Sequence, residues 1–145
     1  MSLQQQKCSG LLERFPLPIK ELSENGSFGV LFENQMILRE KLLGPDSLNL
    51  TDKQISDQIR LHIEAMIHET SELRELLAWK HWKQYPDNFS IDKEEARFEV
   101  ADLMCFLMNI AILLGMSGDE LLHYTYAKQK HNVERQEDPK LGYVK

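Results

Sequence analysis

Two pairs of acidic residues at helical spacing are the part of this chain best suited to chemistry. Glu69 and Glu72 form one pair, and Glu99 and Asp102 form another thirty residues later. Residues three apart share one face of a helix, so each pair directs two carboxylates to one point if the helices pack together. Four converging carboxylates need a cation. Mg²⁺ is the natural candidate because it prefers oxygen ligands, and Mn²⁺ can substitute for it.

Apolar neighbours separate these pairs from ordinary surface acids. Glu72 and Glu75 have the same spacing, so spacing alone decides nothing. Glu99 and Asp102, however, lie in the most apolar helical stretch of the chain. Glu69 shares a helical row with Ile59, Ile63, Met66, Leu73 and Leu76. A buried carboxylate must bind a cation or a proton. The pattern alone leaves a metal site and a solvated acidic face both open.

Cationic and aromatic side chains supply groups that could hold a nucleotide. Lys128, Asn132 and Arg135 lie in the segment KQKHNVERQ, and such donors bind phosphates. They could equally form a solvated basic face that complements a helix dipole. The segment WKHWK contributes Trp79, Lys80, Trp82 and Lys83. Its indoles could stack on a base or close the end of a helix bundle. Carboxylates that could hold a cation, together with cationic side chains that could bind phosphates, favour hydrolysis of a phosphoanhydride.

Composition is that of one compact domain with a small ligand. The chain has 145 residues and a net charge of −6, without the basic run that a nucleic-acid groove needs. No apolar stretch reaches membrane-spanning length, and the start lacks the layout of a signal peptide. We therefore expect a cytoplasmic protein that binds neither nucleic acid nor membrane. Cys8 and Cys105 are expected to be free thiols.

Helical periodicity and capping residues predict an all-α fold. Residues 1–27 form an extended or partly ordered arm, 28–136 the domain, and 137–145 a tail. Within the domain we expect four helices. The first spans about 28–43, and the second starts at a Thr51–Gln54 capping box and runs towards Pro86. The third starts after Asp92 and ends near Gly115. The fourth starts after Ser117 and runs through Arg135. Short connections predict a four-helix-bundle-like core.

Association is expected to complete this core. The third helix is apolar around most of its circumference, so one chain cannot bury every face. We expect a homodimer or a homotetramer.

The segments HETSEL, WKHWK, FEVADLMCFL and KQKHNVERQ, followed by Gly142 and Tyr143, resemble the all-α nucleoside triphosphate pyrophosphohydrolases. This superfamily includes MazG-like proteins and dimeric dUTPases, and the dUTPase branch is the most similar. The resemblance covers about residues 28–143. It implies release of pyrophosphate from a nucleoside triphosphate, with dUTP the expected substrate.

The resemblance also implies roles for the motif residues. Glu69, Glu72, Glu99 and Asp102 would bind Mg²⁺, Lys128, Asn132 and Arg135 would contact phosphates, and Trp79 to Lys83 would border the nucleotide pocket. Within the acidic group we assign Glu69 to orient or deprotonate the attacking water, because its helical row points most directly into the bundle.

One position departs from the dUTPase pattern. Dimeric dUTPases carry a glutamine in the first helix and an asparagine four residues later, and both help to read uracil. Gln35 matches, but Arg39 stands at the second position. Arginine donates hydrogen bonds and accepts none, so it offers nothing to the N–H of uracil. Another nucleotide, such as dCTP, therefore stays open as the substrate.

Two other classes of protein compete with the hydrolase. A helical bundle with a dinuclear transition-metal site would need Glu-x-x-His pairs, whereas both pairs here end in carboxylates. A non-catalytic helical interaction module would leave its acids in solvent and would bind no divalent metal with useful affinity.

Overall fold

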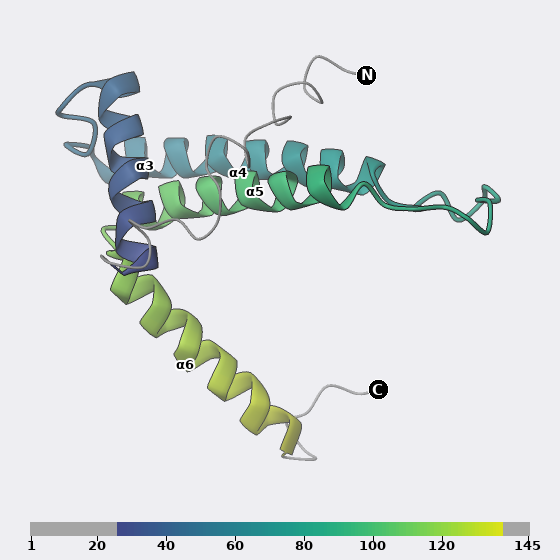
Figure 1. The fold of residues 1–145 in the computed structure, drawn as a ribbon. Coiled ribbons are helices and arrows are strands. Elements are labelled where there is room, and N and C mark those ends of the chain that lie inside the picture. Colours follow the sequence, from purple (N-terminus) through teal and green to yellow (C-terminus); the bar gives the residue numbers. More distant parts are fainter. Residues whose placement is uncertain (1–25, 138–145) are drawn as a thin grey trace.

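The computed structural model describes residues 26–137, which fold into four helices with no strand among them (Figure 1). This confirms the all-α prediction. The arm expected before residue 26 and the tail expected after residue 137 lie outside the described residues. The helices are α3 (Ser27–Leu43), α4 (Asp52–Glu75), α5 (Lys93–Leu113) and α6 (Gly118–Glu137).

The predicted capping residues begin three of the four helices. The Thr51 hydroxyl accepts from the backbone N–H of Gln54, whose side chain accepts from the backbone N–H of Thr51. Ser117 and Glu120 exchange the same pair of hydrogen bonds at the start of α6, and Asp92 caps α5. Each cap satisfies amides that a helix leaves without intrahelical partners. The sequence therefore predicted these starts correctly.

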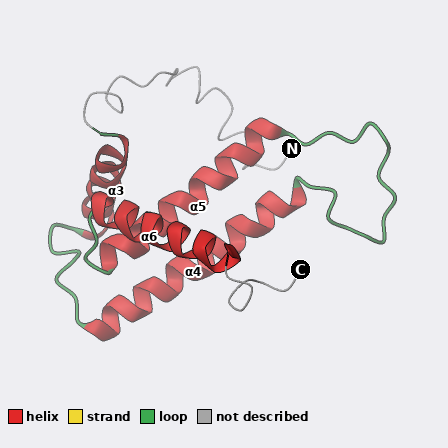
Figure 2. Ribbon diagram, turned by 90° about the horizontal axis from the view of Figure 1, so that it is seen from below, coloured by secondary structure: helices red, strands yellow, loops and turns green. Residues whose placement is uncertain are grey.

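Helices α4 and α5 lie side by side and antiparallel along most of their lengths, while α3 crosses the end of this pair (Figures 1 and 2). The buried core lies where α3 meets the C-terminal half of α5. It consists of Phe32, Met108, Ala111 and Ile112. Within residues 26–137, the core is therefore concentrated at one end of the α4–α5 pair, and the rest of the pair packs mainly on itself.

Helix α6 begins against α3 and then projects away from the α4–α5 pair (Figure 1). Its first residue, Gly118, is buried, and a Cβ atom there would lie 3.2 Å from the carbonyl oxygen of Phe28. Many large apolar side chains stay exposed, among them Leu61, Ile63, Ile67, Val100, Leu107, Leu122 and Val133. These side chains therefore stay uncovered within the described residues.

The second helix is shorter than predicted. It ends at Glu75, so the segment from Trp79 to Lys83 lies in the long loop between α4 and α5 instead of closing a helix. Within this loop the backbone N–H of Lys80 donates to the Tyr85 hydroxyl, 3.1 Å away, instead of to a helical carbonyl. The guanidinium of Arg74 stacks on the Trp79 ring at 4.2 Å from its centroid. These local contacts replace the helical turn that the apolar periodicity predicted.

Among residues 26–137, no single helix has the length and apolar character to cross a membrane. Helices α5 and α6 pass that test only as a pair, which is bent by 105°.

Candidate metal centre and adjoining cavity

The acidic pairs of α4 and α5 meet in the structure. One carboxylate oxygen from each of Glu69, Glu99 and Asp102 lies within 4.8 Å of the other two. Glu69 comes from α4, and the other two come from α5, which runs antiparallel beside it. The side-by-side packing assumed for the two acidic motifs is therefore confirmed, and it converges three hard oxygen ligands on one region.

The burial of Glu99 and the repulsion among the acids make this cluster costly without a cation, although Asp102 is exposed. Glu99 is only 7% exposed, and its Oε2 atom has no hydrogen-bond partner in the described chain. Desolvation, followed by repulsion from Glu72, Glu69, Asp102 and Glu95, raises the pKa of Glu99 to about 7. Desolvation is also the main cause of the raised pKa values of Glu69 and Asp102. Bound positive charge would reverse these effects, so the donor set fits a divalent metal ion.

Glu72 belongs to the same electrostatic group but not to the tightest cluster. Its charge contributes to the raised pKa of Glu69, Glu99 and Asp102 alike. Its Oε1 atom lies 3.2 Å from Nε2 of His68, one helical turn earlier. The tightest cluster does not include Glu72, so its role as a fourth ligand stays a prediction.

The cluster belongs to a longer seam with alternating three- and four-residue spacing. On α4 the seam runs through Gln58, His62, Ala65, Glu69 and Glu72, and on α5 it runs through Glu95, Glu99, Asp102, Phe106 and Asn109. Such spacing keeps one helix face turned towards an adjacent helix. The ring centroids of His62 and Phe106, one residue from each helix, lie 6.0 Å apart, which supports this pairing. One end of the seam is therefore acidic, and the other is polar but mostly uncharged.

Glu95 is an acid of this group that the two predicted acidic pairs do not include. It lies one turn before Glu99, and desolvation, then Asp92, Glu94, Asp102 and Glu72, raise its pKa. The four-residue step from Glu99 back to Glu95 continues the α5 row, so the seam spacing could have identified it.

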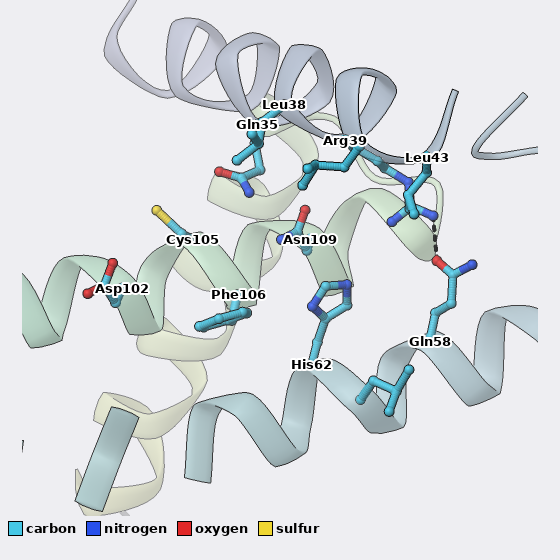
Figure 3. Close-up of a pocket in the computed structure, with 12 residues that line it drawn as sticks. Gln35, Leu38, Arg39, Leu43, Gln58, His62, Asp102, Cys105, Phe106 and Asn109 are labelled. Carbon is cyan, nitrogen blue, oxygen red and sulfur yellow. Dashed lines mark hydrogen bonds between the residues drawn. The ribbon is translucent and has the colours of Figure 1, made fainter. Parts of the chain in front are cut away.

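A cavity of about 610 Å³ lies along the uncharged end of the seam and reaches the acidic end at Asp102. Helices α3, α4 and α5 all contribute to its wall (Figure 3). The cavity is lined by Gln35, Leu38, Arg39, Leu42, Leu43, Gln58, Leu61, His62, Asp102, Cys105, Phe106 and Asn109. Asp102 belongs both to the carboxylate cluster and to this wall. A ligand in the cavity can therefore reach a cation held by the cluster.

The structure places two predicted pocket residues in this wall and adds others that the sequence reasoning missed. Gln35 and Arg39 line the cavity, as their assignment to the nucleotide pocket requires. Gln58, His62 and Asn109 were not predicted. All three continue the seam defined by the acids. Extending that row towards the other end of each helix would have found them.

The remaining predicted site residues lie elsewhere in the single chain. Lys128, Asn132 and Arg135 belong to α6, which projects away from the α4–α5 pair, and none of them lines the cavity. The segment from Trp79 to Lys83 lies in the loop beyond the ends of α4 and α5 and does not line the cavity either. Trp82 is 67% exposed. The phosphate-binding and pocket-bordering roles of these residues stay predictions.

Comparison with known proteins places the chain in a family. Residues 27–132 match a family model described as dUTPase. A dCTP pyrophosphatase of Enterobacteria phage T4 is 33% identical over 69 residues, which are 41% of this chain and 40% of the relative. A dCTP pyrophosphatase of Enterobacteria phage LZ5 is 31% identical over 114 residues, 64% of this chain and 66% of the relative.

The chain therefore spans between 40% and 66% of the length of the curated relatives that it matches. No solved structure matches it significantly. The family match covers most of the chain, including both acidic pairs and the cavity wall. This chain belongs to the dUTPase family, as its resemblance to the all-α pyrophosphohydrolases predicted.

Proposed function

We propose that this chain is a Mg²⁺-dependent nucleoside triphosphate pyrophosphohydrolase. It would convert a deoxypyrimidine triphosphate into the monophosphate and pyrophosphate. One observation carries the proposal: Asp102 joins the carboxylate cluster to a cavity whose volume is in the range of small-ligand sites. The family match and the names of the two phage relatives support it.

The carboxylates of Glu69, Glu72, Glu99 and Asp102 would hold the cation. When bound, Mg²⁺ supplies positive charge to phosphate oxygens and lowers the pKa of a bound water, and Mn²⁺ can replace it in this role. The cavity would bind the nucleoside and leave its triphosphate at the acidic end, beside Asp102. Positioning of the phosphates next to the cluster would then supply much of the rate enhancement.

Glu69 is our candidate for the group that orients or deprotonates the attacking water. Its pKa is raised by desolvation and by the charges of Glu72 and Asp102, which increases its affinity for a proton. It also lies in the cluster itself, within reach of any water bound there.

Lys128, Asn132 and Arg135 are proposed to contact the phosphates, and Trp79, Lys80, Trp82 and Lys83 to border the pocket. Since one chain does not bring these residues to the cavity, we propose that they act in an assembled homodimer or homotetramer. The large apolar side chains exposed on α4, α5 and α6 support such association. We further propose a cytoplasmic enzyme that acts on free nucleotides and not on nucleic acid.

Pyrophosphate release from a panel of ribo- and deoxyribonucleoside triphosphates tests this proposal. We expect release from dCTP or dUTP with Mg²⁺, partial activity with Mn²⁺, and none with excess chelator. Absence of release from every nucleotide would reject the enzyme and favour the non-catalytic interaction module. Release that persists in chelator would reject the metal centre while leaving the nucleotide pocket in place.

A further inference from the structure

Arg39 is a buried cation in the wall of the cavity. It is 4% exposed, although arginine is rarely buried without partners. Its Nη2 group donates to the carbonyl oxygen of Ser47, at 2.8 Å. It also donates to the side-chain oxygen of Gln58, and Figure 3 shows this second bond. These bonds fix the guanidinium between α3, the loop after it and α4. The position of the charge is therefore set before any ligand enters.

One donor of this guanidinium has no partner. The Nε–H group of Arg39 is buried and makes no hydrogen bond within residues 26–137. A buried donor without an acceptor costs roughly 1 to 3 kcal/mol, so native structures rarely keep one without a reason. Arg39 also lines the cavity, so a ligand bound there lies beside this guanidinium.

The two sides of the cavity carry different chemical groups. Its wall contains one guanidinium, that of Arg39, and one carboxyl group, that of Asp102, and the two lie on different sides of it in Figure 3. Asp102 belongs to the carboxylate cluster, where the phosphates of a nucleotide would lie. The base would therefore extend towards Arg39. Desolvation and the nearby Arg39 charge lower the pKa of His62, which keeps this end of the cavity free of a second cation.

The hydrogen-bonding edge of the base decides which pyrimidine fits. A guanidinium only donates. Cytosine presents two adjacent acceptors, O2 and N3, whereas uracil presents a donor, N3–H, between its two carbonyl groups. A donor-only group beside N3 therefore pairs with cytosine and opposes uracil. The exocyclic amine of cytosine needs an acceptor, and the side-chain amides of Gln35 and Asn109 in the same wall each carry one.

We propose that Arg39 reads the base and selects dCTP over dUTP. This inference rests on the proposed function, and it reverses the preference for dUTP that the family resemblance alone implies. Placing a buried donor opposite another donor makes the binding free energy much less favourable, whereas losing an apolar contact makes it only modestly less favourable. We expect the catalytic efficiency for dCTP to exceed that for dUTP by at least about tenfold, the ratio that corresponds to 1.4 kcal/mol.

A purely structural role for Arg39 makes a different prediction. Its bonds to Ser47 and Gln58 hold the loop after α3 against α4. If that were its whole role, replacing it would lower the thermal midpoint without changing the ratio between the two substrates.

The test compares kcat/KM for dCTP and dUTP, with Mg²⁺, in the wild-type protein, Arg39→Gln and Arg39→Lys. Glutamine adds an acceptor, so we expect the dCTP:dUTP ratio to fall at least about tenfold, to near unity or below, while lysine, which only donates, should retain the preference for dCTP. Arg60→Gln is the matched control, because Arg60 is an exposed arginine of α4 paired with Glu64 and should leave the ratio unchanged.

Binding of dCMP and dUMP by calorimetry provides a readout independent of turnover. Tighter binding of dCMP by the wild type, lost in Arg39→Gln, supports the inference even if no pyrophosphate is released, an outcome that would reject only the proposed function. Should Arg39→Gln fail to fold, the wild-type ratio and that of Arg39→Lys decide. A wild-type preference for dUTP, or an unchanged ratio in folded Arg39→Gln, would overturn the assignment of Arg39.

Discussion

Replacing Glu99 with glutamine should lower pyrophosphate release by at least about 100-fold while leaving the protein as stable as before or more so. Loss of a group that merely supports a metal ligand typically costs 10- to 100-fold, so loss of a ligand should cost at least as much. Glu99 is buried, its Oε2 atom has no hydrogen-bond partner in the described chain, and four other acids raise its pKa. An uncharged amide of similar shape removes that repulsion without leaving a cavity.

Opposite effects on activity and stability distinguish this result from simple unfolding. The measurements are kcat/KM with saturating Mg²⁺ and the free energy of unfolding in chelator at pH 8. Glu75→Gln is the matched control, since Glu75 is an exposed acid three residues after Glu72 that lies outside the carboxylate cluster. The control should retain activity. Unchanged turnover in Glu99→Gln would remove Glu99 from the metal centre.

The metal-free protein should lose stability as the pH rises from about 4.5 to 7. The pKa of Glu99 is about 7 in the folded protein, against 4.5 as the ordinary value. Between these values the folded state keeps a proton that the unfolded state has released, so the free energy of unfolding falls as the pH rises. At about 1.4 kcal/mol per pKa unit, the loss is on the order of 3 kcal/mol. It continues as the pH passes through the folded-state pKa and is complete at about pH 8.

Glu99→Gln isolates this contribution. Burial lowers the pKa of His62, which makes the protein more stable as the pH rises towards the ordinary pKa of histidine and so opposes the trend. The difference between wild type and variant cancels this effect, because both proteins keep His62. Denaturant titrations in chelator should give equal stabilities near pH 4.5 and a more stable variant at pH 8. A difference that does not change with pH would show that Glu99 is not protonated in the folded state.

Helix positions followed from the sequence because capping chemistry is local. Thr51 with Gln54, Asp92 with Glu95, and Ser117 with Glu120 each specify a helix start within one turn, and all three bonds form. The acidic pairs were identified because their spacing and apolar surroundings are also properties of a short stretch. Their convergence then required only that α4 and α5 pack side by side.

The end of α4 and the cavity could not be predicted in the same way. The end of α4 depends on contacts of Trp79 and Tyr85 within the following loop, which compete with a helix that the apolar pattern would allow. The cavity depends on how α3 crosses the α4–α5 pair. Arg39 is held in the cavity wall by its hydrogen bonds to Ser47 and Gln58, which form only once the helices have packed. Crossing angles are set by packing over whole helices and not by local residues.

Metal occupancy and catalysis measured in one titration test the central claim most directly. Mn²⁺ is added to metal-free protein, bound metal is counted by electron paramagnetic resonance, and pyrophosphate release from dCTP and dUTP is measured on the same samples. If the carboxylates of α4 and α5 form the catalytic metal centre, release will rise in proportion to bound Mn²⁺, and Glu99→Gln will lose both together. Release without bound metal, or full occupancy in Glu99→Gln, would contradict the account.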